Sequence, residues 1–253
     1  MRGAAIMMVA PYQVETVNKI GFKKLGVLPH PLDDSFLGVS AEEKERASLS
    51  LKTEYACDIA LFSSTRHVWH PRYLGLPDYK GNDLVIRAYA RYVQQCRGKK
   101  QKPKLFLIEK GPDVADSKTL IRQLEIENEV VWLAEIPRDK LLKFYAGADL
   151  FFDQFSIGCL ATSAVEAMAC GTPTLSYIGN PADVKTPFYK TWPPVINVRD
   201  EEGIFREMTR ILGDSSLRAR LQIDGAEWVR TECSWQKMRD DLYHLLVQSK
   251  GAQ

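Results

Sequence analysis

Short apolar runs alternate with longer stretches of helical periodicity along most of this chain. The apolar runs are rich in aromatic and β-branched residues, which is typical of strands buried on both faces of a parallel sheet. We expect strands at 58–63, 104–108, 130–133, 149–152, 174–178 and 195–198. Apolar residues at helical spacing predict helices between them, at 84–95, 118–124, 139–146 and 160–170. This alternation predicts an α/β fold with a doubly wound, Rossmann-like parallel sheet.

Both ends of the chain depart from this alternation. After residue 200 the pattern is helical throughout, and it predicts a C-terminal helical segment at 202–212, 216–230 and 235–248. Before residue 58 we expect, in order, a strand, a short helix, a proline-containing link and a charged helix, at 4–9, 12–20, 27–33 and 41–52. The loop at 64–79 is far longer than the roughly two to six residues usual between a strand and a helix, so we expect it to have a functional role.

Composition and charge exclude several classes of protein. The 34 basic and 32 acidic residues give a net charge of +2, which provides no general attraction to nucleic acid or to a membrane. The five cysteines are odd in number and contain no C-x-x-C pair, so we expect free thiols and a cytoplasmic location. No apolar run reaches the roughly 18–20 residues needed to cross a bilayer. The apolar stretch after Arg2 is short and no convincing cleavage site follows it, so we expect no signal peptide.

Familiar phosphate-binding loops and metal sites are absent from the sequence. The chain has no G-x-G-x-x-G after a strand and no G-x-x-x-x-G-K-[ST], which disfavours a dinucleotide oxidoreductase and a P-loop ATPase. His67 and His70 lie three residues apart without a third ligand nearby in the sequence, so we expect no metal site there.

The segment 148–176 carries the most informative chemistry. A predicted strand ends at Asp153 and Gln154, a loop containing Gly158 follows, and the next helix stops at Gly171. Ligands of open parallel sheets bind at the carboxyl ends of strands, where a helix N-terminus offers N–H groups to phosphate or sugar hydroxyls. Glu166 is expected about two turns inside the helix, where a buried carboxylate needs a polar partner. A ribose diol would supply one.

Four motifs carry a resemblance to a known family. They read LPHPLD at 28–33, STR at 64–66 with KGND at 80–83, FYAGADL at 144–150 and EAMACGTP at 166–173. In this order they resemble the C-terminal, donor-binding domain of GT-B fold glycosyltransferases of the retaining group 1. The resemblance covers the chain from about residue 27 onward and is most specific in the last motif.

The resemblance implies a role for each matching residue. Arg66 and Lys80 match the basic pair that grips the diphosphate of the donor and stabilises the charge on the leaving nucleotide. Glu166 matches the acid that accepts hydrogen bonds from the ribose hydroxyls. The loop whose main-chain N–H groups face the sugar or phosphate is matched by Gly158, Cys159 and Leu160. Two positions at which the family holds the nucleotide are matched by Gly111 and Ile136.

One position departs from the family pattern. Many members carry a second acid eight residues before the ribose-binding one, and that acid touches the transferred sugar. Here the position is Gly158. Either Asp153 or Gln154 contacts the sugar instead, or the choice of donor differs, or turnover is poor. We favour Asp153, as a catalytic residue, and Gln154, because they precede the loop at the end of a strand.

A second departure concerns size. GT-B enzymes close two Rossmann domains over the reaction, and only the last strand and helix of the acceptor domain are expected here. We therefore expect a remnant of that domain, an interdomain link with a helix, the Rossmann-like donor-binding domain and a crossing helix, at 1–26, 27–57, 58–234 and 235–253. A partner domain or subunit would provide the acceptor site, and self-association is the alternative.

The resemblance implies a metal-independent hexosyltransferase without a further cofactor. Its substrate would be a UDP- or GDP-linked sugar, transferred to an acceptor hydroxyl with retention. The chain also lacks an Asp-x-Asp triplet, which disfavours metal-dependent single-domain sugar transferases. Acceptors in this family are often lipid-linked, so a membrane would be involved only indirectly. Two alternatives stay open: a non-catalytic nucleotide-sugar-binding module, and a nucleotide-sugar epimerase of the same two-domain architecture.

Overall fold

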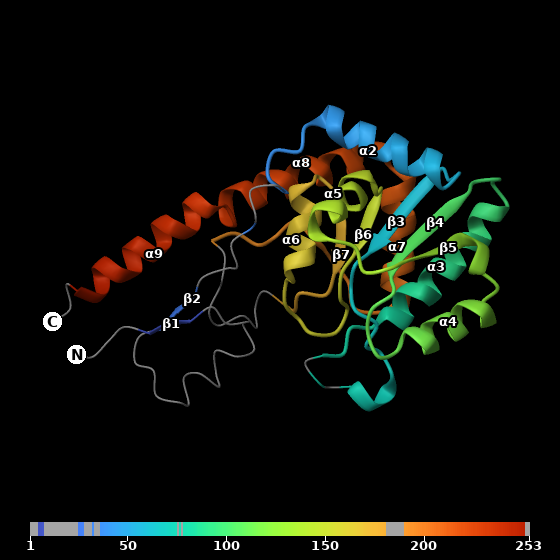
Figure 1. Ribbon diagram of the computed structural model, residues 1–253, viewed down its shortest axis with the longest axis horizontal. Coiled ribbons are helices and arrows are strands. Elements are labelled where there is room, and N and C mark those ends of the chain that lie inside the picture. The colour runs from blue at the N-terminus through green and yellow to red at the C-terminus, as the bar shows by residue number, and fades with distance from the viewer. Residues whose placement is uncertain are drawn as a thin grey trace.

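A six-stranded parallel sheet forms the centre of the protein (Figure 1). The computed structural model describes residues 5–7, 25–27, 32, 36–74, 76, 78–180 and 190–250. The strand order is β5-β4-β3-β6-β7-β8, and every neighbouring pair is parallel. The strands are β3 (Ile59–Ser63), β4 (Pro103–Ile108), β5 (Val130–Leu133), β6 (Leu150–Phe152), β7 (Thr174–Ser176) and β8 (Ile196–Asn197). The predicted α/β class and parallel sheet are confirmed.

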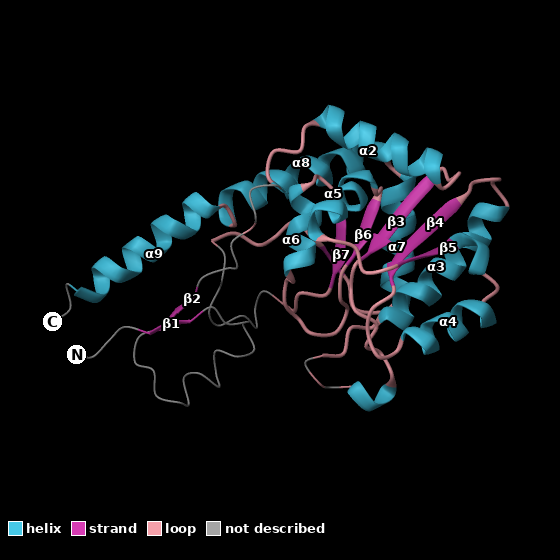
Figure 2. Cartoon of the chain, in the orientation of Figure 1, coloured by secondary structure: helices cyan, strands magenta, loops and turns pink. Residues whose placement is uncertain are grey.

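Helices cover both faces of this sheet (Figure 2). One face carries α2 (Ala41–Glu54), α5 (Arg138–Gly147), α6 (Thr162–Ala169) and α8 (Ser215–Glu232). The other face carries α3 (Asn82–Arg97), α4 (Val114–Gln123) and α7 (Glu201–Gly213). Successive strand residues point to opposite faces, so Phe62 enters the first hydrophobic core and Leu61 enters the second. Two separate apolar cores therefore hold the three layers together.

The strand order places the carboxyl ends of β3 and β6 side by side. The chain runs outward from β3 through β4 to β5, and then returns to β6 on the other side of β3. The order of an open sheet reverses at such a switch point, and ligands bind in the crevice outside it. The loop at 64–80 follows β3 and the loop at 153–161 follows β6. Both loops with predicted site residues therefore meet at the switch point.

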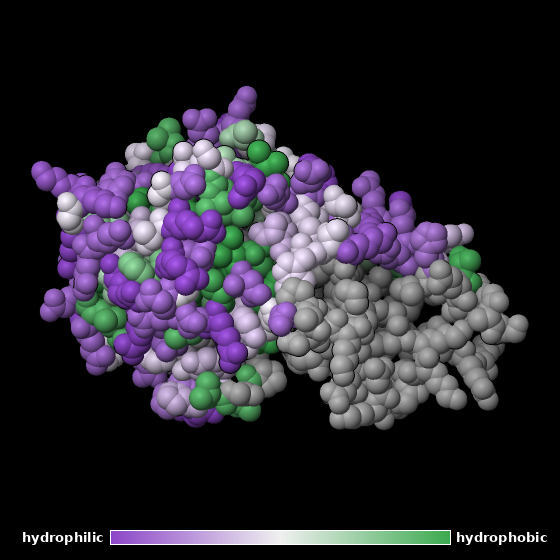
Figure 3. Space-filling model, turned by 180° about the vertical axis from the view of Figure 1, so that it is seen from behind, coloured by the Kyte–Doolittle hydropathy of each residue, from purple (hydrophilic) through white to green (hydrophobic). Residues whose placement is uncertain are grey.

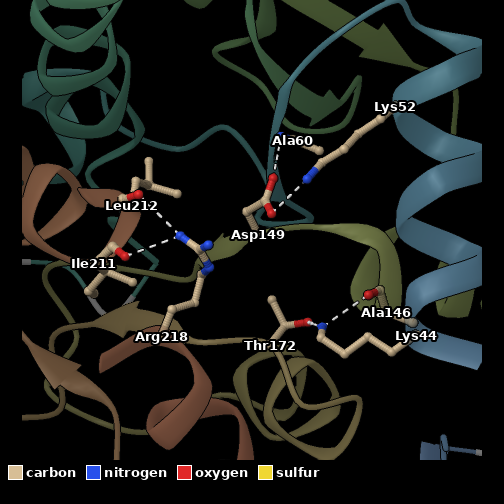
Figure 4. A network of polar contacts seen from close by, with 9 residues as sticks. All are labelled: Lys44, Lys52, Ala60, Ala146, Asp149, Thr172, Ile211, Leu212 and Arg218. Atoms are coloured by element: carbon tan, nitrogen blue, oxygen red, sulfur yellow. Dashed lines mark hydrogen bonds and ion pairs between the residues drawn. The ribbon is translucent and has the colours of Figure 1, made fainter. Parts of the chain in front are cut away.

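Helix α2 is fastened to the sheet domain by buried polar contacts (Figure 4). Lys44 Nζ donates to Ala146 O at 3.0 Å and to Thr172 Oγ1 at 2.9 Å, and burial lowers the pKa of Lys44 to about 8. About two turns of helix further on, Lys52 Nζ lies 2.9 Å from Asp149 Oδ1, while Asp149 Oδ2 accepts from Ala60 N at 2.8 Å. Asp149 thus joins α2 to both β3 and the start of β6.

Most predicted elements appear with shifted ends. The helix predicted at 118–124 begins at Val114, and the strand predicted at 195–198 shrinks to two residues. The helix predicted from residue 160 begins at Thr162, because Ala161 is still extended with ψ 160°. Glu166 therefore lies about one turn inside α6 and not two, which corrects the sequence-based expectation.

The terminal segments lie outside the six-stranded sheet. β1 (Ala5–Met7) and β2 (Leu25–Val27) form a separate parallel pair, of which the sequence predicted only the first strand. The short helix expected at 12–20 lies outside the described residues, and so does most of the link at 27–33. Helix α9 (Trp235–Lys250) projects away from the sheet domain in Figure 1. None of the helices in the described ranges combines the length and the apolar character that a membrane span requires.

Candidate functional site

A fully buried carboxylate anchors the long loop that follows β3. Asp113 Oδ2 accepts the N–H groups of Trp69 and His70, at 2.7 and 2.9 Å. Asp113 Oδ1 lies 3.3 Å from a guanidinium nitrogen of Arg72. Charge-assisted bonds to a buried carboxylate are among the stronger hydrogen bonds in proteins. These contacts tie residues 69–72 of the loop to Asp113, directly before α4.

A second set of contacts holds the same loop from the side of His67. Ser117 Oγ lies 2.8 Å from His67 Nδ1 and accepts from Trp69 Nε1 at 2.7 Å. His67 N donates to Lys110 O at 2.7 Å, directly beside Gly111. A Cβ added at Gly111 would lie 2.5 Å from His67 O, and Gly111 has φ +117°. Gly111 is therefore needed for the close contact between the loops after β3 and β4. This need is independent of the predicted contact of Gly111 with a nucleotide.

The two predicted diphosphate ligands stand at the ends of this loop. Arg66 is exposed and lies 3.2 Å from Asp78 Oδ1, an exposed pair of the kind that contributes about 0–1 kcal/mol. Lys80 is partly buried, and desolvation lowers its pKa while the nearby Asp153 opposes the shift. Within the described part of the chain, Lys80 Nζ makes no hydrogen bond or ion pair. Both cations are therefore available to an anion.

Asp153 is buried beneath Lys80, with 3% of its surface exposed. Its Oδ1 accepts from Ser163 Oγ at 2.9 Å and its Oδ2 accepts from Ser176 Oγ at 3.2 Å. Burial raises the pKa of Asp153, and the hydrogen bonds from Ser163 and Ser176 oppose that shift. This geometry does not favour the predicted contact of Asp153 with a sugar. It favours a role for Asp153 as a buried negative charge that offsets the positive charge of Lys80.

Gln154 is also buried, and its carboxamide is fully used inside the protein. Nε2 donates to Cys159 O at 2.7 Å and to Tyr177 O at 2.8 Å. Oε1 accepts from Ser156 N at 3.0 Å and from Ile157 N at 2.6 Å. A carboxamide has two donor hydrogens and two acceptor lone pairs. No hydrogen-bonding capacity is left for the sugar contact that the sequence predicted.

The loop before α6 presents main chain at the switch point. Gly158 has φ +75° and faces Gly179 of the loop after β7, which has φ +79°. A Cβ at Gly179 would lie 3.2 Å from Gly158 O, so the two backbones approach closely. Burial raises the pKa of the Cys159 thiol to about 11, which makes it a poor nucleophile. Leu160 is half-buried and packs against the first core.

Glu166 points from α6 into the interior, with 6% of its surface exposed. It forms a side-chain hydrogen bond with Tyr145, whose hydroxyl also lies 3.0 Å from Ser64 Oγ. Burial raises the pKa of Tyr145, and the charge of Glu166 adds to the shift. Tyr145 therefore links Glu166 to the residue two positions before Arg66.

The remaining predicted residues follow the neighbouring strands along the same edge. Gly111 lies after β4 and Ile136 after β5, where Ile136 is half-buried against the first core. Lys110 Nζ and Glu135 Oε2, 2.8 Å apart, join these two loops. The structure thus groups Arg66, Lys80, Asp153 and Cys159 at the switch point, and places Gly111 and Ile136 further along the edge.

Sequence reasoning missed the residues that support the site. Asp113, Ser117, Ser163 and Ser176 carry its buried polar contacts. Asp113 could have been found as a polar residue between a strand and a helix, but the serines have no distinguishing pattern. Among the described residues, no three histidine, cysteine, aspartate or glutamate side chains are grouped as a metal site requires.

The stability of the protein should fall in mild acid because of His67. Burial lowers the pKa of His67 to about 4, although the charge of Asp113 opposes the shift. Between pH 6.5 and 4, His67 is protonated in the unfolded chain but stays neutral in the folded chain. The contribution of neutral His67 to the free energy of unfolding is therefore fully present above pH 6.5 and is lost as the pH falls. We expect a loss of about 1.5 kcal/mol between pH 6.5 and 5 in urea titrations. His67→Gln should lose measurably less over the same range, and equal losses would contradict the assignment.

The comparisons with known proteins agree with this arrangement. The family model "Glycosyl transferases group 1" matches residues 75–228, which is more than half of the chain. That range includes Lys80, Gly111, both loops after β6 and β7, and Glu166. No match was found among curated proteins.

Solved structures share the fold at low sequence identity. Sucrose-phosphate synthase from Thermosynechococcus elongatus superposes with a TM-score of 0.69 at 19% identity, over 99% of this chain and 60% of that chain. Anabaena HepE in complex with UDP and glucose superposes with a TM-score of 0.71 at 14% identity, over 97% of this chain and 64% of that chain. A third structure is the C-terminal domain of LpcC, a glycosyl transferase group 1 family protein from Francisella tularensis. It superposes with a TM-score of 0.60 at 15% identity, over 81% of this chain and 100% of that domain.

These matches define the extent of the likeness. The chain spans less than two thirds of the sucrose-phosphate synthase and of HepE. It shares with them the parallel, helix-covered sheet of GT-B glycosyltransferases. With a family model over more than half of its length, the chain belongs to the group 1 glycosyltransferases.

Proposed function

We propose that this chain binds a nucleoside-diphosphate sugar at the switch point and serves as the donor-binding part of a glycosyltransferase. The observation that carries the proposal is the grouping of Lys80 and Arg66 beside the loop before α6, with buried Glu166 behind them. Lys80 makes no ion pair within the described residues, so an incoming diphosphate would face little competition. HepE, which shares the fold, was crystallised with UDP and with UDP-glucose.

The proposed chemistry breaks the bond between the anomeric carbon and the diphosphate oxygen. An acceptor hydroxyl attacks the anomeric carbon and loses its proton, and the nucleoside diphosphate leaves with the bonding electrons. Lys80 and Arg66 would stabilise the charge on the leaving oxygens without a metal ion. Retention and a hexosyl donor are part of the proposal, and NMR of the product's anomeric configuration tests retention.

Acceptor binding is proposed to come from outside the domain at 58–234. The donor-binding domain, the link at 27–57, the remnant at 1–26 and the crossing helix at 235–253 are proposed on the family pattern. Light scattering and co-purification test for self-association and for a partner subunit. All five cysteines are free, which supports the proposed cytoplasmic location, and cell fractionation tests it.

A non-catalytic nucleotide-sugar-binding module is the second candidate. Its specific support is Gly158 at the position of the family's sugar-binding acid, together with Gln154, whose carboxamide makes all its hydrogen bonds inside the protein. Asp153, which accepts from Ser163 and Ser176, is buried as well. Both candidates bind the nucleotide sugar. Turnover of the donor, as hydrolysis or transfer in the presence of acceptor extracts, separates them.

Replacing Glu166 tests the proposed donor site directly. We expect one of UDP, GDP and ADP to bind in calorimetry, and Glu166→Gln to weaken that binding about tenfold, since a ribose hydroxyl loses a charged acceptor worth about 1.5 kcal/mol. Glu129→Gln is the control, because Glu129 precedes β5 at the opposite edge of the sheet. If the wild-type protein binds none of these nucleotides, the proposal is contradicted. If Glu166→Gln binds the nucleotide as tightly as wild type, Glu166 is not part of the site.

A further inference from the structure

We infer that Gln154 is a positioning residue that shapes the donor-facing loop and does not itself touch the donor. The inference rests on the proposed function, because it concerns how main-chain N–H groups of the loop before α6 are held for a diphosphate sugar. Its basis is the set of contacts that one buried side chain makes around that loop.

The carboxamide of Gln154 bonds to both ends of a short loop. It accepts from Ser156 N and Ile157 N at the beginning and donates to Cys159 O at the end. Gly158 lies between these bonded residues, in the left-handed region at φ +75°. The side chain therefore fixes a conformation that the backbone alone would populate as one of several.

The same side chain sets the position of the loop relative to the sheet. Gln154 lies two residues after the end of β6, and its Nε2 also donates to Tyr177 O in the loop after β7. That second loop is held in turn by Asn197 of β8, whose Oδ1 accepts from Ile178 N at 3.0 Å and whose Nδ2 donates to Gly179 O at 2.7 Å. Two carboxamides therefore connect the loops after β6 and β7 to three neighbouring strands.

The backbone contact between these loops depends on the same arrangement. Gly158 O would lie 3.2 Å from a Cβ at Gly179, so the loops pack main chain against main chain. The glycine that replaces the family's acid is thus part of a loop-to-loop contact. Donor recognition at this point falls to main-chain groups, and their direction depends on Gln154.

The test uses Gln154→Glu and calorimetry with the mono- and diphosphates of uridine, guanosine and adenosine. Glutamate keeps the acceptor contacts to Ser156 N and Ile157 N, but it places an oxygen against the carbonyls of Cys159 and Tyr177. We expect the affinity for the preferred diphosphate to fall about tenfold, while the affinity for the matching monophosphate changes less than about twofold.

The matched control is Tyr89→Phe, which removes a buried hydrogen bond to Glu129 O at the opposite edge of the sheet. It should lower the unfolding temperature without changing either affinity. Gln154→Asn, which keeps the amide but is one carbon shorter, should fall between wild type and Gln154→Glu.

Three outcomes would overturn the inference. Equal diphosphate affinity of wild type and Gln154→Glu would remove Gln154 from donor binding, and the proposed function would stand. A parallel loss of mono- and diphosphate affinity would make Gln154 a general structural residue. Absence of nucleotide binding by the wild-type protein would overturn the proposed function, and this inference with it.

Discussion

Replacing Gly111 by alanine is expected to lower the free energy of unfolding by about 3 kcal/mol. The added Cβ would lie 2.5 Å from His67 O and 2.6 Å from His67 N. Both are backbone atoms held by hydrogen bonds, so neither can turn aside as the end of a side chain could. The φ of +117° adds conformational strain. Urea titrations with an unchanged m-value measure the loss.

Gly38 provides the matched control for this substitution. It also has a positive φ, at +90°, but an added Cβ would meet nothing within 4 Å. Gly38→Ala should therefore cost only the conformational part, about 1 kcal/mol. A similar loss in the free energy of unfolding for the two substitutions would show that the loops after β3 and β4 separate easily. That result would contradict a close contact between Gly111 and His67.

Replacing Asp113 by alanine is expected to cost about 3–4 kcal/mol and to free the loop that carries Arg66 and Lys80. The N–H groups of Trp69 and His70 would lose their acceptor in a buried position. Urea titrations measure the stability, and limited trypsin digestion should show faster cleavage within 64–80.

Two further variants separate the parts of the Asp113 contact. Asp113→Asn keeps an oxygen for the two N–H groups and should cost about 1 kcal/mol. Arg72→Ala removes only the exposed partner, 57% accessible at its side chain, and should cost less than about 0.5 kcal/mol. A loss in Arg72→Ala as large as that in Asp113→Ala would place the energy in the ion pair and contradict the role of the backbone N–H groups.

Most of the fold could be predicted from the chain itself. The apolar runs at 58–63, 104–108 and 130–133 became β3, β4 and β5 because parallel strands buried on both faces need continuous apolar sequence. The strand β2 was missed, since Leu25–Val27 is too short to show a period. The start of α6 was misplaced because Leu160 and Ala161 continue its apolar pattern while the backbone is still extended.

The candidate site could be predicted only in outline. Motifs singled out Glu166 and the two cations, and the structure brings Lys80 close to Arg66 and Asp153 at the switch point. Their roles in donor binding stay predictions. Asp153 and Gln154 were predicted to face a sugar because polar residues at a strand end often face ligand. Sequence does not record which way such side chains turn, and here Ser163, Ser176 and the loop main chain take up their polar atoms.

The position of β3 in the middle of the sheet also affects how the chain folds during synthesis. β3, β4 and β5 can pair as they are made, but one edge of β3 stays open until β6 is synthesised, and the bond between Ala60 and Asp149 spans 89 residues. That edge carries Leu61 and Phe62, and open apolar edges promote association between chains. The pairing of β3 with β6 at the switch point is thus expected to be the slow contact of the domain, and nascent chains stalled before residue 150 are expected to be the most exposed to aggregation.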